Sequence, residues 1–143
     1  MTGIVSAQNM RPDWVDKAQY LRFDEQSGVP AYIKFKPGQE IKSESFDVFI
    51  RAFLSLDQQD EYRLLNTETD QLGITHKRFQ QYLNGYPVEF GTFLSHEKAG
   101  LIVSVNGEHF PIKPTNGQVL TREAALDAAM SHLHAAEYMW EVP

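Results

Sequence analysis

An alternating segment that leads into Asn84-Gly85 constrains the fold of this chain more than any other feature. Side chains of an extended strand point alternately to its two faces, so the period of two over Gly73–Tyr82 predicts a β-strand. Asn-Gly is the strongest short signal for a hairpin, because Gly85 accepts the positive φ that the turn requires. Pro87–His96 is then the returning strand. One face of the first strand carries Ile74, His76, Arg78, Gln80 and Tyr82, and the other carries Thr75, Lys77, Phe79, Gln81 and Leu83.

Three further segments have the composition of strands. Val29–Phe35 is short and has Pro30 at its start, where a missing N–H is tolerated. Tyr62–Asn66 is a second candidate. Leu101–Asn106 is rich in β-branched residues, which favours a central strand, and Asn106-Gly107 predicts another turn after it. The series predicts an antiparallel meander of about four or five strands.

Two segments predict amphipathic helices packed on this sheet, which places the chain in the α+β class. The first follows Ser43 or Ser45 as N-cap, and the second follows Thr121. Met1–Asp24 is weakly patterned and predicts a loose arm with a helical turn near Trp14. The first apolar stripe is Phe46, Phe49, Ile50, Phe53 and Leu54, and the second is Leu126, Ala129, Met130 and Leu133.

Composition narrows the class of partner. The chain has 19 acidic and 13 basic residues, a net charge of -6, and no basic run, which argues against nucleic acid and anionic membranes as partners. The absence of cysteine removes disulfides, thiolate metal sites and a cysteine nucleophile. The first ten residues do not read as a signal peptide, and no apolar run approaches the ~20 residues of a membrane span.

The motifs of common active sites are missing. His96-Glu97 begins the zinc-protease motif His-Glu-x-x-His, but Gly100 stands where the second histidine belongs. There is no Gly-x-Ser-x-Gly elbow and no glycine-rich phosphate loop. His76 and His96 can approach each other across the hairpin, yet the nearby cation Arg78 makes them a poor metal site. We therefore expect no metal or cofactor in this chain, and a binding role instead of catalysis.

Asp70–Val88 reads D-x-x-G-x-T-H-x-R-x-Q-Q-x-x-x-G-x-P-V and resembles the FTP motif, found in the N-terminal propeptides of thermolysin-type and fungalysin-type zinc metalloproteases. The resemblance continues through Gly91, His96, Gly100 and "IVSVNG", and it covers roughly residues 29–143. The segment "LTREAALDAAMSHL" is similar to the helix that follows the motif. The ending "AEYMWEVP" is similar to a linker that leads into a PepSY-like half.

The resemblance implies a cystatin-like fold and a domain organisation. Residues 1–28 are expected to be a weakly structured arm, residues 29–137 the FTP-like domain, and residues 138–143 a linker towards a PepSY-like half outside this sequence. We expect the natural chain to continue beyond this point and to be secreted. Such propeptides act as intramolecular chaperones and as inhibitors of the attached enzyme, which they keep as a zymogen, so the implied partner is a metalloprotease catalytic domain. The zinc ion is expected there and not in this chain.

Two structural roles remain open for the motif residues. They can form a hydrogen-bond network within the fold, or they can contact the protease. Two other functions also remain open: a free-standing secreted inhibitor or binding module of the same fold, and a small cone-shaped α+β enzyme with His76 as general base. Tyr138 and Trp140 are candidates for an interdomain contact. The candidate motif and contact residues are His76, Arg78, Gln80, Gln81, Tyr82, Gly85, Pro87 and His96.

Overall fold

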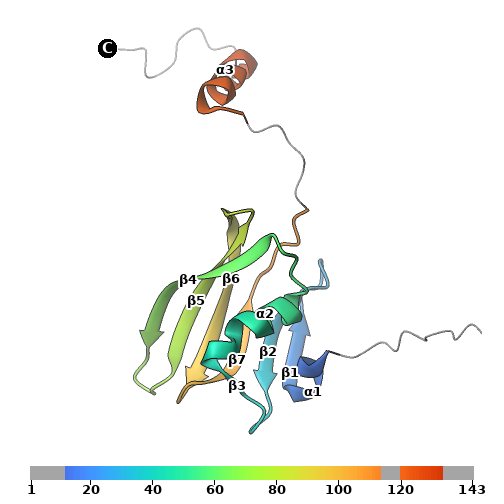
Figure 1. Cartoon of the computed structure of the whole chain (residues 1–143), viewed down its shortest axis with the longest axis vertical. Helices are drawn as coiled ribbons and strands as arrows, with labels where there is room; N and C mark the ends of the chain where they lie inside the picture. Colours follow the sequence, from blue (N-terminus) through green and yellow to red (C-terminus); the bar gives the residue numbers. More distant parts are fainter. Residues whose placement is uncertain (1–11, 114–119, 134–143) are drawn as a thin grey trace, which may run out of the picture. The chain divides into compact units, whose positions relative to one another are not determined.

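The structure is a computed structural model that describes residues 12–113 and 120–133 of the 143-residue chain. The chain divides into two compact units, Met1–Ile112 and Lys113–Pro143, and each is described by itself. The first unit combines a large antiparallel sheet with short helices (Figure 1). The predicted α+β class is therefore confirmed. The likeness to a cystatin stays a prediction.

The sheet of the first unit has seven strands within the described residues. Their order is β1-β2-β7-β6-β5-β4, while β3 pairs with β7, and every pairing is antiparallel. Strands β4 to β7 form the predicted meander, and the β1–β2 hairpin extends it beyond β7. The strands are β1 (Ala18–Phe23), β2 (Pro30–Phe35), β3 (Ile41–Lys42), β4 (Asp60–Thr69), β5 (Thr75–Leu83), β6 (Tyr86–Lys98) and β7 (Leu101–Gly107).

The segment expected to be a weakly structured arm contains regular structure. Helix α1 spans Asp13–Lys17, and β1 follows it directly and pairs with β2. Four of the six β1 residues are exposed and none is buried, so this edge strand has little of the hydrophobic alternation that reveals a strand. The expected count of four or five strands was too low because β1 and the two-residue β3 carry too little pattern to be recognised.

One predicted turn is present and another is not. Asn84 and Gly85 have φ angles of 50° and 79°, which confirms the β5–β6 hairpin turn. Asn106 and Gly107, in contrast, remain inside β7. A Cβ atom at Gly107 would collide with the carbonyl oxygen of Thr92 and the Cα of Phe93. Glycine is therefore needed here for the close approach of β6, and not for a turn.

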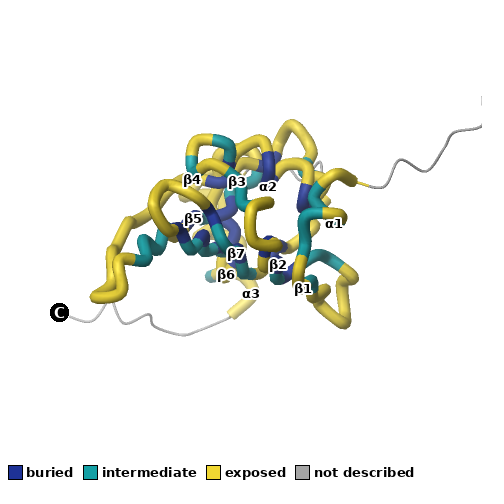
Figure 2. The backbone as a smooth tube through the Cα atoms, turned by 90° about the horizontal axis from the view of Figure 1, so that it is seen from below, coloured by how far each residue is buried: buried dark blue, intermediate teal, exposed yellow. Residues whose placement is uncertain are grey.

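The core lies between the sheet and α2 (Phe46–Leu54), which follows a 3-10 turn at Ser43–Ser45. Ser45 occupies the N-cap position without a capping hydrogen bond from its side chain. The Phe46 and Phe79 rings stack at 3.9 Å, and Trp14 of α1 meets Phe53 edge-on at 5.0 Å. Both helices therefore contribute side chains to the same core. Figure 2 colours buried positions dark blue; those of α2 are the predicted Phe46, Phe49, Ile50, Phe53 and Leu54.

The second unit contains the predicted C-terminal helix, α3 (Arg122–Leu133). Its start is as predicted, because the Thr121 hydroxyl oxygen accepts a hydrogen bond from the Ala124 N–H at 3.1 Å. None of its described residues is buried, so its packing on the sheet stays a prediction. The expected linker 138–143, with Tyr138 and Trp140, lies outside the described residues. No helix in the described ranges is long and apolar enough to span a membrane.

Candidate binding face of the sheet

The face of the sheet opposite α2 presents two rows of cross-strand neighbours that each run through six strands. Residues paired across strands share a face, so the register assigns every member. Positions one residue away, such as Ile33 and Val105, are fully buried on the α2 side. We call the two rows together the open face. The first row is Tyr20, Lys34, Ser104, His96, His76 and Glu68, and the second is Arg22, Tyr32, Asn106, Leu94, Arg78 and Asn66.

A chain of four polar side chains crosses the middle of the open face. His76 and His96 are cross-strand partners, as expected, and their Nδ1 atoms lie 2.7 Å apart. Nε2 of His76 lies 3.1 Å from Oδ2 of Asp70, in the β4–β5 turn. Nε2 of His96 lies 2.6 Å from Oδ1 of Asn106. The two imidazoles therefore form one connected unit.

The groups at the ends of this chain set the direction of its hydrogen bonds. A carboxylate oxygen only accepts, so Nε2 of His76 donates to Asp70. The amide oxygen of Asn106 likewise accepts from Nε2 of His96. In the contact between the two Nδ1 atoms, one atom donates and the other accepts.

Gln80 and Gln81 hold the backbone of the sheet. The two N–H bonds of the Gln80 amide are shared among three carbonyl oxygens. These are the oxygens of Val88 at 2.6 Å, Gly91 at 3.0 Å and Gln81 at 3.1 Å. These carbonyls border an irregular stretch of β6, where the register with β5 shifts between Gln80 and Tyr82. Phe90 lies in that stretch with a φ angle of 63° and a side chain that is 74% exposed.

Gln81 is fully buried and holds the segment after β7 in place through a pair of hydrogen bonds, which we call the clamp. Its amide donates to the carbonyl oxygen of Phe110 at 2.8 Å and accepts from the Phe110 N–H at 3.1 Å. A Cβ atom at Gly91 would lie 2.9 Å from the Gln81 Cβ, so the clamp requires glycine there. The two glutamines therefore have a role inside the fold.

The other predicted residues are divided between the open face and the hairpin. Arg78 is exposed on the open face and forms no ion pair with another described residue. The Tyr82 ring lies under the guanidinium of Arg63 at 4.1 Å, and that arginine donates to Glu61 at 2.9 Å. This hydrogen bond lowers the pKa of Glu61. Gly85 forms the turn, and Pro87 pairs with Tyr82.

An ion pair stands on the opposite, helix-covered face of the hairpin. Nζ of Lys77 lies 3.0 Å from a carboxylate oxygen of Glu97 and 2.5 Å from Oγ of Ser43, just before α2. Glu97 is buried and also accepts from the Ser95 hydroxyl at 3.1 Å. The pair therefore ties the start of α2 to two strands of the sheet.

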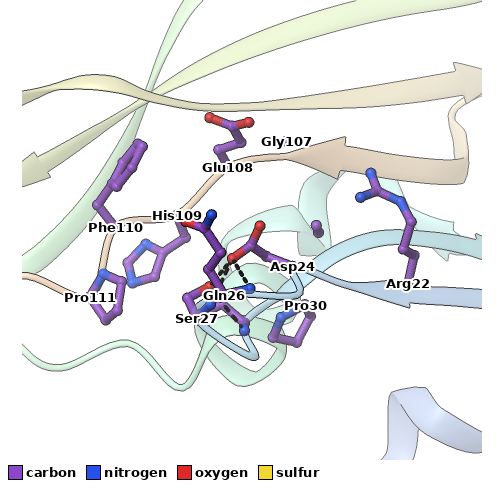
Figure 3. Close-up of a pocket in the computed structure, with 12 residues that line it drawn as sticks. Arg22, Asp24, Gln26, Ser27, Pro30, Gly107, Glu108, His109, Phe110 and Pro111 are labelled. Carbon is purple, nitrogen blue, oxygen red and sulfur yellow. Dashed lines mark hydrogen bonds between the residues drawn. The ribbon is translucent and has the colours of Figure 1, made fainter.

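A cavity of about 330 Å³ opens where β2 and β7 diverge. The two strands pair only over Tyr32–Lys34, after which Glu108 remains bonded to Thr92 of β6. Figure 3 shows the segment Gly107–Pro111 facing the β1–β2 turn, in which Asp24 accepts hydrogen bonds from Gln26 and Ser27. Several of these lining residues are exposed, and His76 is not among them.

His109 lines this cavity and is buried beside Tyr62. The Tyr62 hydroxyl lies 3.0 Å from Nδ1 of His109. Burial raises the pKa of Tyr62 and lowers the pKa of His109, so both groups are neutral near neutral pH. The phenol therefore donates to Nδ1, and the imidazole proton resides on Nε2. This pair could not be recognised in the sequence, because the partners are 47 positions apart and neither belongs to a recognisable motif.

The comparisons with known proteins place a family motif on the meander. Residues 60–108 match the profile of the Fungalysin/Thermolysin Propeptide Motif, FTP. The match begins at the first residue of β4 and ends just after β7, so the chain carries an FTP motif that corresponds to β4–β7. No curated protein and no solved structure matches the chain. Within the described residues, no three histidine, aspartate or glutamate side chains are placed to hold a metal ion.

Proposed function

We propose that this chain is the N-terminal propeptide part of a secreted thermolysin-type zinc metalloprotease. In this role it assists the folding of the catalytic domain and inhibits it until the propeptide is removed. The FTP match over residues 60–108 carries the proposal. The protease supplies the zinc ion and the chemistry, and this chain supplies a preformed surface.

The organisation of the motif supports a binding role. Gln80, Gln81 and Gly91 are occupied in holding β6 and the segment after β7. These internal contacts leave His76, His96 and Arg78 on a sheet face that neither α1 nor α2 covers. A rigid sheet loses little conformational entropy when a partner binds it. The motif thus combines residues that hold the fold with residues available for contact.

A free-standing inhibitor or binding module with the same fold is the alternative role. It differs from a propeptide in the gene product, since a propeptide requires a His-Glu-x-x-His catalytic domain downstream. The third possibility, an enzyme with His76 as general base, requires a pocket around that histidine. His76 lies on a sheet face and does not line the cavity described above.

Refolding of the enzyme tests the proposed function. The mature thermolysin-type protease of the same organism is unfolded in denaturant and diluted with or without this chain in equimolar amount. The proposal predicts a several-fold higher yield of active protease with the chain present. A matched control is the same chain unfolded by a destabilising core substitution, Phe53→Asp. An equal yield with and without the folded chain contradicts assistance in folding.

A further inference from the structure

The charge of the open face is opposite in sign to that of the whole chain. The two rows of the open face have three basic residues, Arg22, Lys34 and Arg78, against Glu68, and Asp70, which contacts His76, is a second carboxylate on this face. The chain as a whole has 13 basic and 19 acidic residues. The three cations stand on three different strands, and all three are exposed. The sheet therefore gathers positive charge on one face of an acidic protein.

The size and composition of the open face suit a protein interface. Six strands spaced by ~4.8 Å make a surface about 24 Å wide. Tyr20 is 60% exposed at one edge, with Nζ of Lys34 5.9 Å from its ring centre. Tyrosine and arginine are the residues on which interfaces most often depend. Their backbones are already ordered in strands, so the loss of entropy on binding is small.

We propose that the open face is the docking surface of this chain and that its occupant is an acidic surface of the metalloprotease catalytic domain. This inference rests on the proposed function and adds the location and charge of the contact. The polar chain from Asp70 to Asn106 lies at its centre, and Arg22, Lys34 and Arg78 surround that chain. The contact is electrostatic at its border, so it weakens as salt screens the charges.

A nucleic acid is the less favoured occupant of the same surface. Affinity for nucleic acid grows with the number of phosphates that basic residues neutralise. Three cations beside Glu68 and Asp70, on a chain of net charge -6, provide few such contacts. A second copy of this chain, also acidic overall, is the other competitor. The experiment below distinguishes all three.

The test uses charge reversal with a matched control. Lys34→Glu/Arg78→Glu changes the open face, and Lys113→Glu/Arg122→Glu makes the same change of net charge at residues that belong to neither row. Dissociation constants for the inactivated mature protease are measured by calorimetry at low and high salt. We expect the open-face variant to bind at least about tenfold more weakly and with less dependence on salt. We expect the control variant to bind like the parent chain.

Other results of these measurements would overturn the docking site, the proposed function or the occupant. Equal affinity of the open-face variant and the control overturns the docking site while leaving the proposed function standing. Absence of any binding by the folded parent chain overturns the proposed function and, with it, the occupant. Binding of a single-stranded oligonucleotide that charge reversal of the open face removes overturns the protease as occupant. Self-association of the chain in sedimentation that the same reversal removes also overturns it. The neutral variant Lys34→Gln/Arg78→Gln, with melting curves for all chains, ensures that a folding defect is recognised.

Discussion

The Nδ1 atoms of His76 and His96 lie 2.7 Å apart, on neighbouring strands at the centre of the sheet. Two N–H groups cannot point at each other over this distance, so one Nδ1 donates and the other accepts. His96→Leu removes this contact and the contact with Asn106, and we expect a loss of about 1–2 kcal/mol of stability. The exposed His132→Leu in α3, as control, should change the stability little. Urea unfolding measures both variants, and equal stability of His96→Leu and the parent chain would contradict a structural role of the contact.

Gln81 and Gly91 should be energetically coupled. Gln81→Leu removes both hydrogen bonds to the Phe110 backbone, and we expect a loss of about 2 kcal/mol of stability. Gly91→Ala forces its new Cβ against the Gln81 side chain, and we expect about 2 kcal/mol here too. Because the same side chain is involved, Gly91→Ala/Gln81→Ala should cost less than the sum of its single substitutions. Urea unfolding measures all the variants, and simple additivity contradicts the coupling.

Phe90 offers a substitution that should stabilise the protein. A positive φ is unfavourable for an aromatic residue by roughly 1–2 kcal/mol, whereas glycine adopts it without steric cost. The Phe90 side chain is mostly exposed, so its removal sacrifices little packing. Glycine also gives the unfolded chain more conformational entropy, which offsets part of this gain. We therefore expect Phe90→Gly to raise the free energy of unfolding by about 0.5–1 kcal/mol. The neighbouring exposed Glu89→Gly, as control, should destabilise.

The Lys77–Glu97 ion pair predicts a strong asymmetry between single and double substitutions. Lys77→Met leaves a buried carboxylate without its cation, at a cost on the order of 3 kcal/mol. Lys77→Met/Glu97→Leu removes both charges and should recover most of that loss. Thermal melts of the three proteins check the prediction. A double variant that is less stable than Lys77→Met would show that the pair does not act as a unit.

The buried pair of Tyr62 and His109 predicts loss of stability in acid. Burial lowers the pKa of His109 in the folded chain, so below about pH 6.5 the unfolded chain binds more protons at this residue. Its contribution to stability is present above the ordinary histidine pKa and is lost as pH falls towards the folded value. His109→Gln removes the titrating group and should flatten this part of the stability–pH curve. Urea titrations at several pH values measure it; an unchanged slope contradicts the assignment.

The sequence predicted the parts of the fold that have strong periodicity. The Asn84-Gly85 hairpin and the α2 stripe followed from local patterns, and the structure confirms both. It could not predict β1, because an exposed edge strand lacks alternation. It misread Gly107, since a glycine that admits a neighbouring strand looks the same as one that forms a turn.

The candidate site divides in the same way. The approach of His76 to His96 was expected, but the register of the Asn84-Gly85 turn alone does not produce it. The pairing of β5 with β6 shifts between Gln80 and Tyr82, and this shift brings His76 opposite His96. The open face was not predictable, because it depends on β1 and β2 joining β7 at the edge of the meander. Nor were the internal roles of Gln80 and Gln81, which depend on carbonyl groups freed by an irregular stretch of β6.

Inhibition of the mature protease tests the central claim most directly. The purified chain is titrated into the mature thermolysin-type metalloprotease of the same organism while peptide hydrolysis is followed. We predict saturable inhibition that the Lys34→Glu/Arg78→Glu variant weakens and the Lys113→Glu/Arg122→Glu variant leaves unchanged. Undiminished hydrolysis at saturating concentrations of a chain shown to be folded would contradict the claim that these residues restrain the enzyme.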